Sequence, residues 1–309
     1  MDNWQPSTLS WSFSRKTHLD SCRRHYFYHR FWGQDPKTRW RLYEMRNITT
    51  LKMLQGLVVH DVIADALHAT AEGDTVSVKQ AKKNVTALLR GRYMESQKRL
   101  WHIDNRPPGR KASDITNILE HYYRFPDVHD QARQVQQTAW KCVENLLASE
   151  MWSGIMQHGQ ENWKEVEEDS FQSFDLQGIQ VYARIDFAHN SDQPTIIDWK
   201  TGQPSEQDRK QLVLYSLYAE DKWDWNPLET KLAAVYLQPQ LKIDEFNTSD
   251  DQIAEVKEEV KLSFAQMVEL EPAYGPADIG NFPIAENVYE CRRCRFQGIC
   301  EGAKRLSTG

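Results

Sequence analysis

The sequence has no long hydrophobic run, and this absence excludes several classes of protein. No stretch of the 309 residues approaches the about 18 consecutive apolar residues that a membrane-spanning helix needs. The first residues, MDNWQPSTLSWSFSRK, lack the apolar core of a secretory signal peptide. No internal repeat or low-complexity tract is present. We therefore expect a globular protein of the cytoplasm without membrane contact, folded as one large domain or two modest ones.

Cysteine is scarce and unevenly placed. The five cysteines are an odd number, so a disulfide framework does not account for them. Three of them lie within ten residues, in CRRCRFQGIC (291–300), with the spacing C-x2-C-x5-C. Such closely spaced thiols in a cytosolic protein indicate a metal site, yet three ligands rarely complete one. The site needs a fourth ligand from elsewhere in the chain.

The sequence also lacks an excess of positive charge, since its net charge is −6. This charge argues against a general polyanion binder. The cations are nevertheless concentrated. Residues 23–46 carry seven arginines and lysines against two acids, and residues 82–111 carry nine. Acids gather instead in 161–169 and in 250–271. The basic runs are either solvated helix faces or phosphate-binding surfaces beside an active site.

The hydrophobic pattern changes from helical to strand-like near residue 164. Four helical stretches precede this point: 11–32, 49–70, about 77–100 and about 112–157, the last two separated by the breaker NRPPGR. Four strand-like stretches follow it: 164–174, 178–189, 194–200 and 231–240. Two further helices are expected among the strands, at 205–223 and 250–270. This order predicts an α/β core embedded in a helical shell.

Charged residues follow two neighbouring apolar strands. Asp198 and Lys200 in IIDWKTG are two positions apart, so a strand places both side chains on one face. If 178–189 pairs with 194–200, Asp186 of RIDF approaches the same face. Two carboxylates and an ammonium at a sheet end suit a hard cation, with the lysine near an attacking water or the developing phosphorane charge. The D-x-K pattern alone is weak, since it occurs three times and better fits a solvent-facing pair.

In context, ARIDF…TIIDWKTG followed by QLVLYSLY (211–218) resembles the nuclease core of the PD-(D/E)XK superfamily, in its RecB-like branch. The resemblance implies a restriction-endonuclease-like fold, with a mixed β-sheet core flanked by helices, and metal-dependent hydrolysis of DNA with Mg²⁺ or Mn²⁺. It implies that Asp186 and Asp198 bind the metal and that Lys200 is catalytic. His60 would be a further metal ligand, and Trp199 would contribute its main-chain carbonyl to the metal. Gln211 and Tyr215 would support the lysine and the scissile phosphate. Glu168 is a weaker match to an acid that some members carry.

The iron–sulfur nucleases of this branch, such as those of CRISPR adaptation and the AddB type, have one cysteine before the core and C-x2-C-x5-C after it. By this resemblance Cys22, Cys291, Cys294 and Cys300 bind a [4Fe–4S] cluster, which staples the N- and C-terminal segments together. A tetrahedral Zn²⁺ on the same thiolates is the chemical alternative. The remaining Cys142 is expected to pack as a small apolar residue.

The resemblance covers about 10–70 and 164–302. It divides the chain into an N-terminal helical part of the nuclease core (1–70), a helical insertion (71–163) and the rest of the core with the cluster cysteines (164–309). The implied substrate is single-stranded DNA or DNA ends, cut by an exonuclease in repair, recombination or defence. No G-x4-G-K-[ST] loop is present, so a helicase or a CRISPR or other defence protein would be a separate partner. The alternative is a catalytically silent nuclease-like scaffold that binds DNA or such a partner.

Overall fold

The computed structural model describes residues 8–31, 35–157, 159–166, 172–287 and 291–304. The chain divides into two compact units, each assembled from separated segments. Unit 1 consists of Met1–Thr50, Tyr93–Arg124 and Glu259–Gly309. Unit 2 consists of Leu51–Arg92 and Phe125–Glu258. Within the described residues, no helix has an apolar stretch long enough to span a bilayer.

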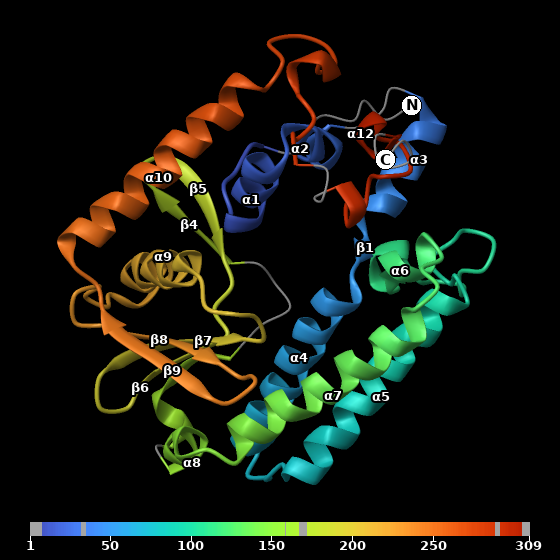
Figure 1. The fold of residues 1–309 in the computed structure, drawn as a ribbon. Coiled ribbons are helices and arrows are strands. Elements are labelled where there is room, and N and C mark those ends of the chain that lie inside the picture. The colour runs from blue at the N-terminus through green and yellow to red at the C-terminus, as the bar shows by residue number, and fades with distance from the viewer. Residues whose placement is uncertain (1–7, 32–34, 158, 167–171, 288–290, 305–309) are drawn as a thin grey trace. The chain divides into compact units, whose positions relative to one another are not determined.

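Unit 2 contains a five-stranded mixed sheet with the strand order β3-β6-β7-β8-β9 (Figure 1). Its strands are β3 (Trp163–Val166), β6 (Phe187–Asn190), β7 (Pro194–Lys200), β8 (Lys231–Tyr236) and β9 (Lys242–Asn247). β7 and β8 are parallel, whereas the other neighbouring strands are antiparallel. β7 and β8 are buried over most of their length, as expected for strands covered on both faces.

Helix α9 (Glu206–Trp223) lies between this sheet and a separate hairpin of β4 (Gln172–Leu176) and β5 (Ile179–Ala183) (Figure 1). A capping box of Ser205 and Asp208 begins the helix. Its residues 212–219 are all buried, because strands pack against more than one side of the helix. The sheet and the hairpin therefore fix the position of α9.

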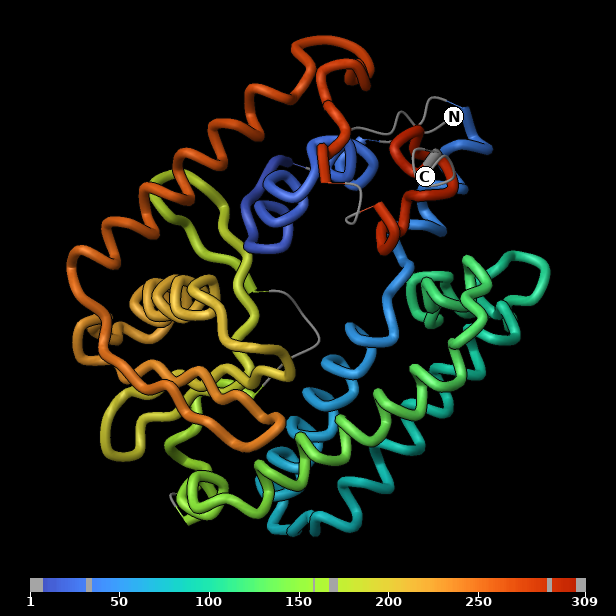
Figure 2. The backbone as a smooth tube through the Cα atoms, viewed as in Figure 1, coloured from blue at the N-terminus to red at the C-terminus, as the bar shows by residue number. Residues whose placement is uncertain are grey.

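Three long helices of unit 2 run side by side (Figure 2). They are α4 (Leu51–Ala71), α5 (Val78–Gln97, of which unit 2 includes the part up to Arg92) and α7 (Val128–Leu147), and α8 (Glu150–Gln157) follows. Val58, Val59 and Val62 on α4 are completely buried. Because β-branched residues are poor helix formers, tertiary packing stabilises α4 more than intrinsic propensity does.

Unit 1 joins the N-terminal helices to the C-terminal segment. Its elements are α1 (Phe13–Ser21), α2 (Arg23–Arg30), α3 (Pro36–Arg46), the parallel pair β1 (Ile48–Thr49) and β2 (Asn117–Ile118), α6 (Leu119–Tyr122), α10 (Asp250–Glu269, from Glu259 onward) and α12 (Glu301–Lys304). The buried indole of Trp11 donates to Ser263 Oγ at 2.8 Å. Arg24 Nε donates to the carbonyl of Phe282 at 2.7 Å. Segments from the two ends of the sequence thus share one core.

The predicted combination of a strand-rich core and many helices is confirmed, but three predicted elements are interrupted. The helix expected over about 112–157 is divided into α6, α7 and α8, and strand β2 precedes them. The helix expected over 11–32 breaks at Cys22, whose backbone is extended and separates α1 from α2. The strand expected over 178–189 breaks at 184–186, because β5 pairs with β4 whereas β6 pairs with β3 and β7. Helix α3 and strand β9 were not predicted from the sequence.

Candidate active site

Two buried carboxylates and a lysine meet at the sheet of unit 2. Asp198 and Lys200 belong to β7, and Asp186 immediately precedes β6, which pairs with β7 in antiparallel register. The backbone N–H of Trp199 donates to Asp186 Oδ2 at 2.6 Å, and this bond fixes the first acid against the neighbouring strand. Asp186 and Asp198 are 6% and 3% exposed. The predicted pairing of the two strands is therefore confirmed.

His60 approaches the same acids from helix α4. Its Nδ1 lies 3.2 Å from Asp186 Oδ1. One helical turn earlier, a Cβ added to Gly56 would lie 3.2 Å from Thr201 Oγ1, which is tighter than an ordinary contact. Because positions four apart share one helix face, the missing side chain at Gly56 lets the His60 face of α4 approach the residue that follows β7.

The Lys200 ammonium connects the strand to helix α9. Its Nζ lies 2.5 Å from Asp198 Oδ2 and donates to Gln211 Oε1 at 2.7 Å. The amide of Gln211 in turn donates to the Tyr215 hydroxyl at 2.6 Å. The i, i+4 spacing on one face of α9 makes this relay possible. The structure thus brings together the lysine and the two helix residues that were grouped with it in the sequence.

Burial and, to a smaller extent, the charge of Asp186 raise the pKa of Asp198 to about 7, against the opposing effects of Lys200 and His60. Asp198 Oδ2 is buried, and the Lys200 ammonium lies 2.5 Å from it. A buried carboxylate in this state gains from a further cation.

Lys200 is protonated at neutral pH. Burial lowers the pKa of its ammonium, but the charges of Asp198, Asp186 and Asp208 outweigh this effect and raise the pKa above its usual value. A lysine in this state does not accept a proton. It provides a fixed positive charge that can stabilise negative charge on a reacting group.

The donor atoms fit a divalent cation. Carboxylate oxygens of Asp186 and Asp198 are the ligands that Mg²⁺ and Mn²⁺ prefer, and the adjacent imidazole of His60 is a further nitrogen donor. Trp199 contributes its N–H to Asp186, while its main-chain carbonyl as a metal ligand stays a prediction. Glu168 lies outside the described residues.

Asp208 is a site residue that was not identified from the sequence. Its Oδ1 lies 3.6 Å from Lys200 Nζ, and its Oδ2 accepts hydrogen bonds from the Ser205 N–H at 2.9 Å and the Tyr236 hydroxyl at 3.0 Å. The S-x-x-D capping pattern at the start of α9 is the sequence signal that could have drawn attention to it. Asp208 therefore both begins the helix and contributes negative charge beside the lysine.

The predicted cluster cysteines lie in unit 1, and among the described residues none of them forms a disulfide. The backbone N–H of Ala285 donates to Cys22 Sγ at 3.4 Å. A Cβ added to Gly302 would lie 3.4 Å from Cys291 Sγ and 3.6 Å from Cys300 Sγ. Burial and, to a smaller extent, the thiolate charges of Cys300, Cys22 and Cys291 raise the pKa of Cys294 to about 12.

The four sulfurs are near one another, but they do not form a compact ligand set. Within the described residues, no three of them lie within 4.8 Å of each other. The assembled cluster site expected from the sequence is therefore not seen in the structure, and its metal stays a prediction. Cys142 is fully buried on α7, as expected for a small apolar residue.

Three histidines of unit 1 form a cluster that was not predicted from the sequence. Nitrogens of His18, His25 and His29 lie within 4.8 Å of one another, and the rings of His18 and His29 are stacked. Burial, together with the charge of Arg295, lowers the pKa of His18 to about 4 and that of His25 to about 3. The imidazoles are therefore neutral at physiological pH, and the surrounding positive charge disfavours a cation among them.

Comparison with known proteins gives a family match and structural neighbours of low sequence identity. No curated protein matches the chain. The crystal structure of SSO0001 aligns with 59% of this chain and 77% of its own, at 16% identity and a TM-score of 0.29. A "Putative exonuclease" from Eubacterium rectale aligns with 49% of this chain and 65% of its own, at 13% identity and a TM-score of 0.29. These TM-scores are too low to establish a common fold.

The sequence match to a family is far more extensive than either structural alignment. It covers residues 10–301, which include all of the acids, the lysine, the histidine and the cysteines discussed above. The chain belongs to the PD-(D/E)XK nuclease superfamily.

Proposed function

We propose that this protein is a metal-dependent deoxyribonuclease whose active site contains Asp186, Asp198 and Lys200. The observation that supports this most strongly is the buried Asp198 carboxylate, which lies beside a second buried acid and 2.5 Å from an ammonium. Membership of the superfamily implies a phosphodiester hydrolase, and its members typically use a divalent metal ion. Burying two acids together costs folding free energy, so a pair of this kind is better explained by cation binding than by a contribution to stability.

In the proposed mechanism, Asp186, Asp198 and His60 would hold one or two Mg²⁺ or Mn²⁺ ions, which would lower the pKa of a water and neutralise phosphate charge. The Trp199 N–H orients Asp186 through its 2.6 Å hydrogen bond. Lys200 stabilises negative charge as it develops on the phosphate. Gln211 holds the ammonium at 2.7 Å, and Tyr215 holds Gln211.

We further propose that Cys22, Cys291, Cys294 and Cys300 hold a [4Fe–4S] cluster. Their mutual proximity supports a shared metal centre, since the thiolate charges of the other three affect Cys294. Zn–S bonds of about 2.3 Å require sulfurs about 3.8 Å apart in a tetrahedral site. The wider separation of these thiols fits the larger iron–sulfur cube better than a single zinc ion.

The proposed substrate is DNA, as single strands or free ends. The test uses end-labelled single-stranded DNA, duplex DNA and RNA of one sequence, incubated with anaerobically purified protein in Mg²⁺, Mn²⁺ or EDTA. We expect DNA cleavage in either metal, faster in Mn²⁺ because an imidazole ligand suits it better than Mg²⁺, and none in EDTA. A ladder from one labelled end would identify an exonuclease and its direction. DNA that is bound but intact in both metals would favour the silent scaffold instead.

A further inference from the structure

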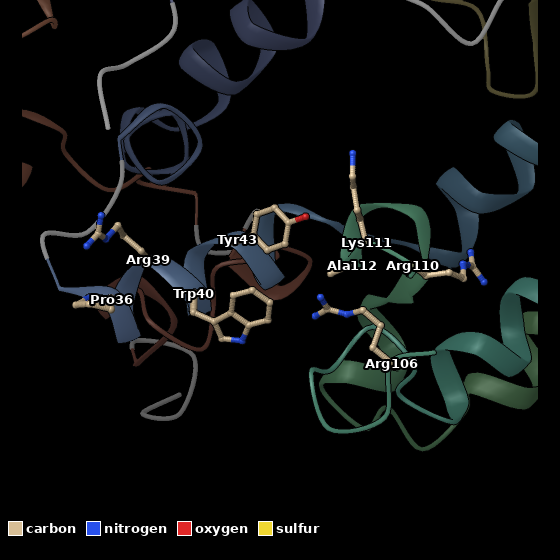
Figure 3. Close-up of a pocket in the computed structure, with 8 residues that line it drawn as sticks. All are labelled: Pro36, Arg39, Trp40, Tyr43, Arg106, Arg110, Lys111 and Ala112. Carbon is tan, nitrogen blue, oxygen red and sulfur yellow. The ribbon is translucent and has the colours of Figure 1, made fainter. Parts of the chain in front are cut away.

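A basic and aromatic pocket opens in unit 1, and the nuclease mechanism does not use it. Its cavity volume is about 520 Å³. Figure 3 shows Trp40 and Tyr43 of α3 facing Arg106 and the neighbouring chain around Lys111. The pocket brings together the two basic runs noted in the sequence, since α3 belongs to 23–46 and the opposite wall belongs to 82–111.

The lining of the pocket is positively charged. Four cations line it (Arg39, Arg106, Arg110 and Lys111), and no acid does. Glu95 pairs with Arg110 at 2.7 Å and offsets one charge. Arg39 and Lys111 form no ion pair within the part of the chain that the structure describes. In a protein with a net charge of −6, such a concentration of unpaired cations favours an anionic ligand.

Arg106 is held in place while one of its donors stays unsatisfied. Its Nη2 donates to the Trp101 carbonyl at 3.1 Å, and its guanidinium carbon lies 5.2 Å from the centre of the Trp40 ring. Its Nε is buried and has no hydrogen-bond partner. A buried guanidinium N–H without an acceptor costs free energy, and a phosphate oxygen is the acceptor that a guanidinium matches best.

The aromatic wall is rigid and partly exposed. The Trp40 indole N–H donates to Glu44 Oε1 at 2.9 Å, so the ring is fixed before any ligand binds. The Tyr43 ring lies beside it, with centroids 5.6 Å apart and planes inclined by 34°. Both side chains are only half-buried. Fixed aromatic faces next to cations are the combination on which single-stranded bases stack while their phosphates are neutralised.

We propose that this pocket binds one nucleotide of a single-stranded nucleic acid, with its base on Trp40 and Tyr43 and its phosphate on Arg106 and Lys111. The inference rests on the proposed function in that nucleic acid is the substrate, and it adds a strand-binding site in unit 1. A duplex does not offer an unstacked base to the aromatic wall. The pocket therefore selects single strands over duplexes.

The test measures binding of a labelled oligo(dT) strand and a duplex of equal length to the full-length protein in EDTA. Arg39→Ala/Lys111→Ala is expected to weaken strand binding about tenfold and to reduce the salt slope by about 0.7, which is the contribution of the one phosphate that the pocket contacts on a single strand. Trp40→Leu is expected to weaken it about tenfold, whereas Trp40→Phe retains stacking and binds nearly as the wild type does. The matched control is Lys79→Ala/Lys242→Ala, which removes two exposed lysines of unit 2 and should leave binding unchanged.

Photocrosslinking of a 5-iodouracil strand locates the contact, and the expected adducts fall on α3. Unchanged strand affinity in both the charge and Trp40→Leu variants, or adducts confined to unit 2, would overturn the proposal. Competition by free dAMP as effective as that by the strand would also overturn it and assign the pocket to a mononucleotide. Because EDTA prevents metal-dependent cutting, the result is independent of cleavage. A protein that binds strands through this pocket but never cuts them would refute the proposed nuclease activity and leave the proposed strand-binding site unaffected.

Discussion

Replacing Lys200 with alanine is expected to lower metal-dependent DNA cleavage on the order of 100- to 1,000-fold, the usual cost of losing one preorganised electrostatic contact to the transition state. The ammonium is protonated and held between Asp198 and Gln211, so its charge is available to the phosphate without reorganisation. Folding and DNA binding should persist, because the cations of the basic runs are unchanged. The measurement is the single-turnover cleavage rate in Mn²⁺, with affinity measured separately in EDTA.

The matched control is Lys210→Ala, which removes a lysine from another copy of the D-x-K pattern. Lys210 pairs with Glu255 at 2.8 Å, so no loss of cleavage is expected. Equal rates for the Lys200 variant and the wild type would remove the lysine from the mechanism. Equal losses in both variants would point to general disruption of α9 and its surroundings instead.

Replacing Cys291 with alanine is expected to remove the iron and the absorbance near 400 nm from anaerobically purified protein. It should also destabilise unit 1 by several kcal/mol, because metal binding contributes directly to folding and here joins segments far apart in the sequence. Cys291 is buried, and its Sγ lies close to Gly302 and therefore to the chain that carries Cys300. Iron content, the absorption spectrum and thermal unfolding of unit 1 are the measurements.

Cys142→Ala is the control for this experiment. Cys142 is buried on α7 in unit 2, so its loss should leave a small cavity but keep the colour and the iron. A colourless wild-type protein that contains one zinc ion would show that the four cysteines bind tetrahedral Zn²⁺ and not an iron–sulfur cluster. A wild type without either metal would reject the four-cysteine site.

Local patterns made the strand part of the site predictable. Side chains of a strand alternate between its faces, so Asp198 and Lys200 had to share one face, and the apolar run before them indicated a central strand. The i, i+4 spacing similarly placed Gln211 and Tyr215 together on α9. The role of His60 came from family resemblance alone, because the distance between a helix and a strand end depends on tertiary packing.

The features that were missed depend on contacts between distant segments. The break at 184–186 arises because β5 and β6 pair with different partners, and no alternation in the sequence reveals a change of sheet. The pocket around Trp40 and Arg106 requires residues 66 positions apart, by the difference 106 − 40, to face each other. The histidine cluster likewise needed the turn at Cys22, which brings His18 of α1 beside α2.

The most direct test of the metal-dependent active site compares the wild type with Asp198→Asn, on end-labelled DNA in Mn²⁺, Mg²⁺ or EDTA. Asparagine keeps the shape of the side chain but removes the charge that would bind the cation. Because burial disfavours the ionised carboxylate and raises its pKa to about 7, the variant should be at least as stable as the wild type at pH 8 without metal. We predict metal-dependent cleavage by the wild type and none by the folded variant. Cleavage by Asp198→Asn at the wild-type rate would contradict the proposed active site.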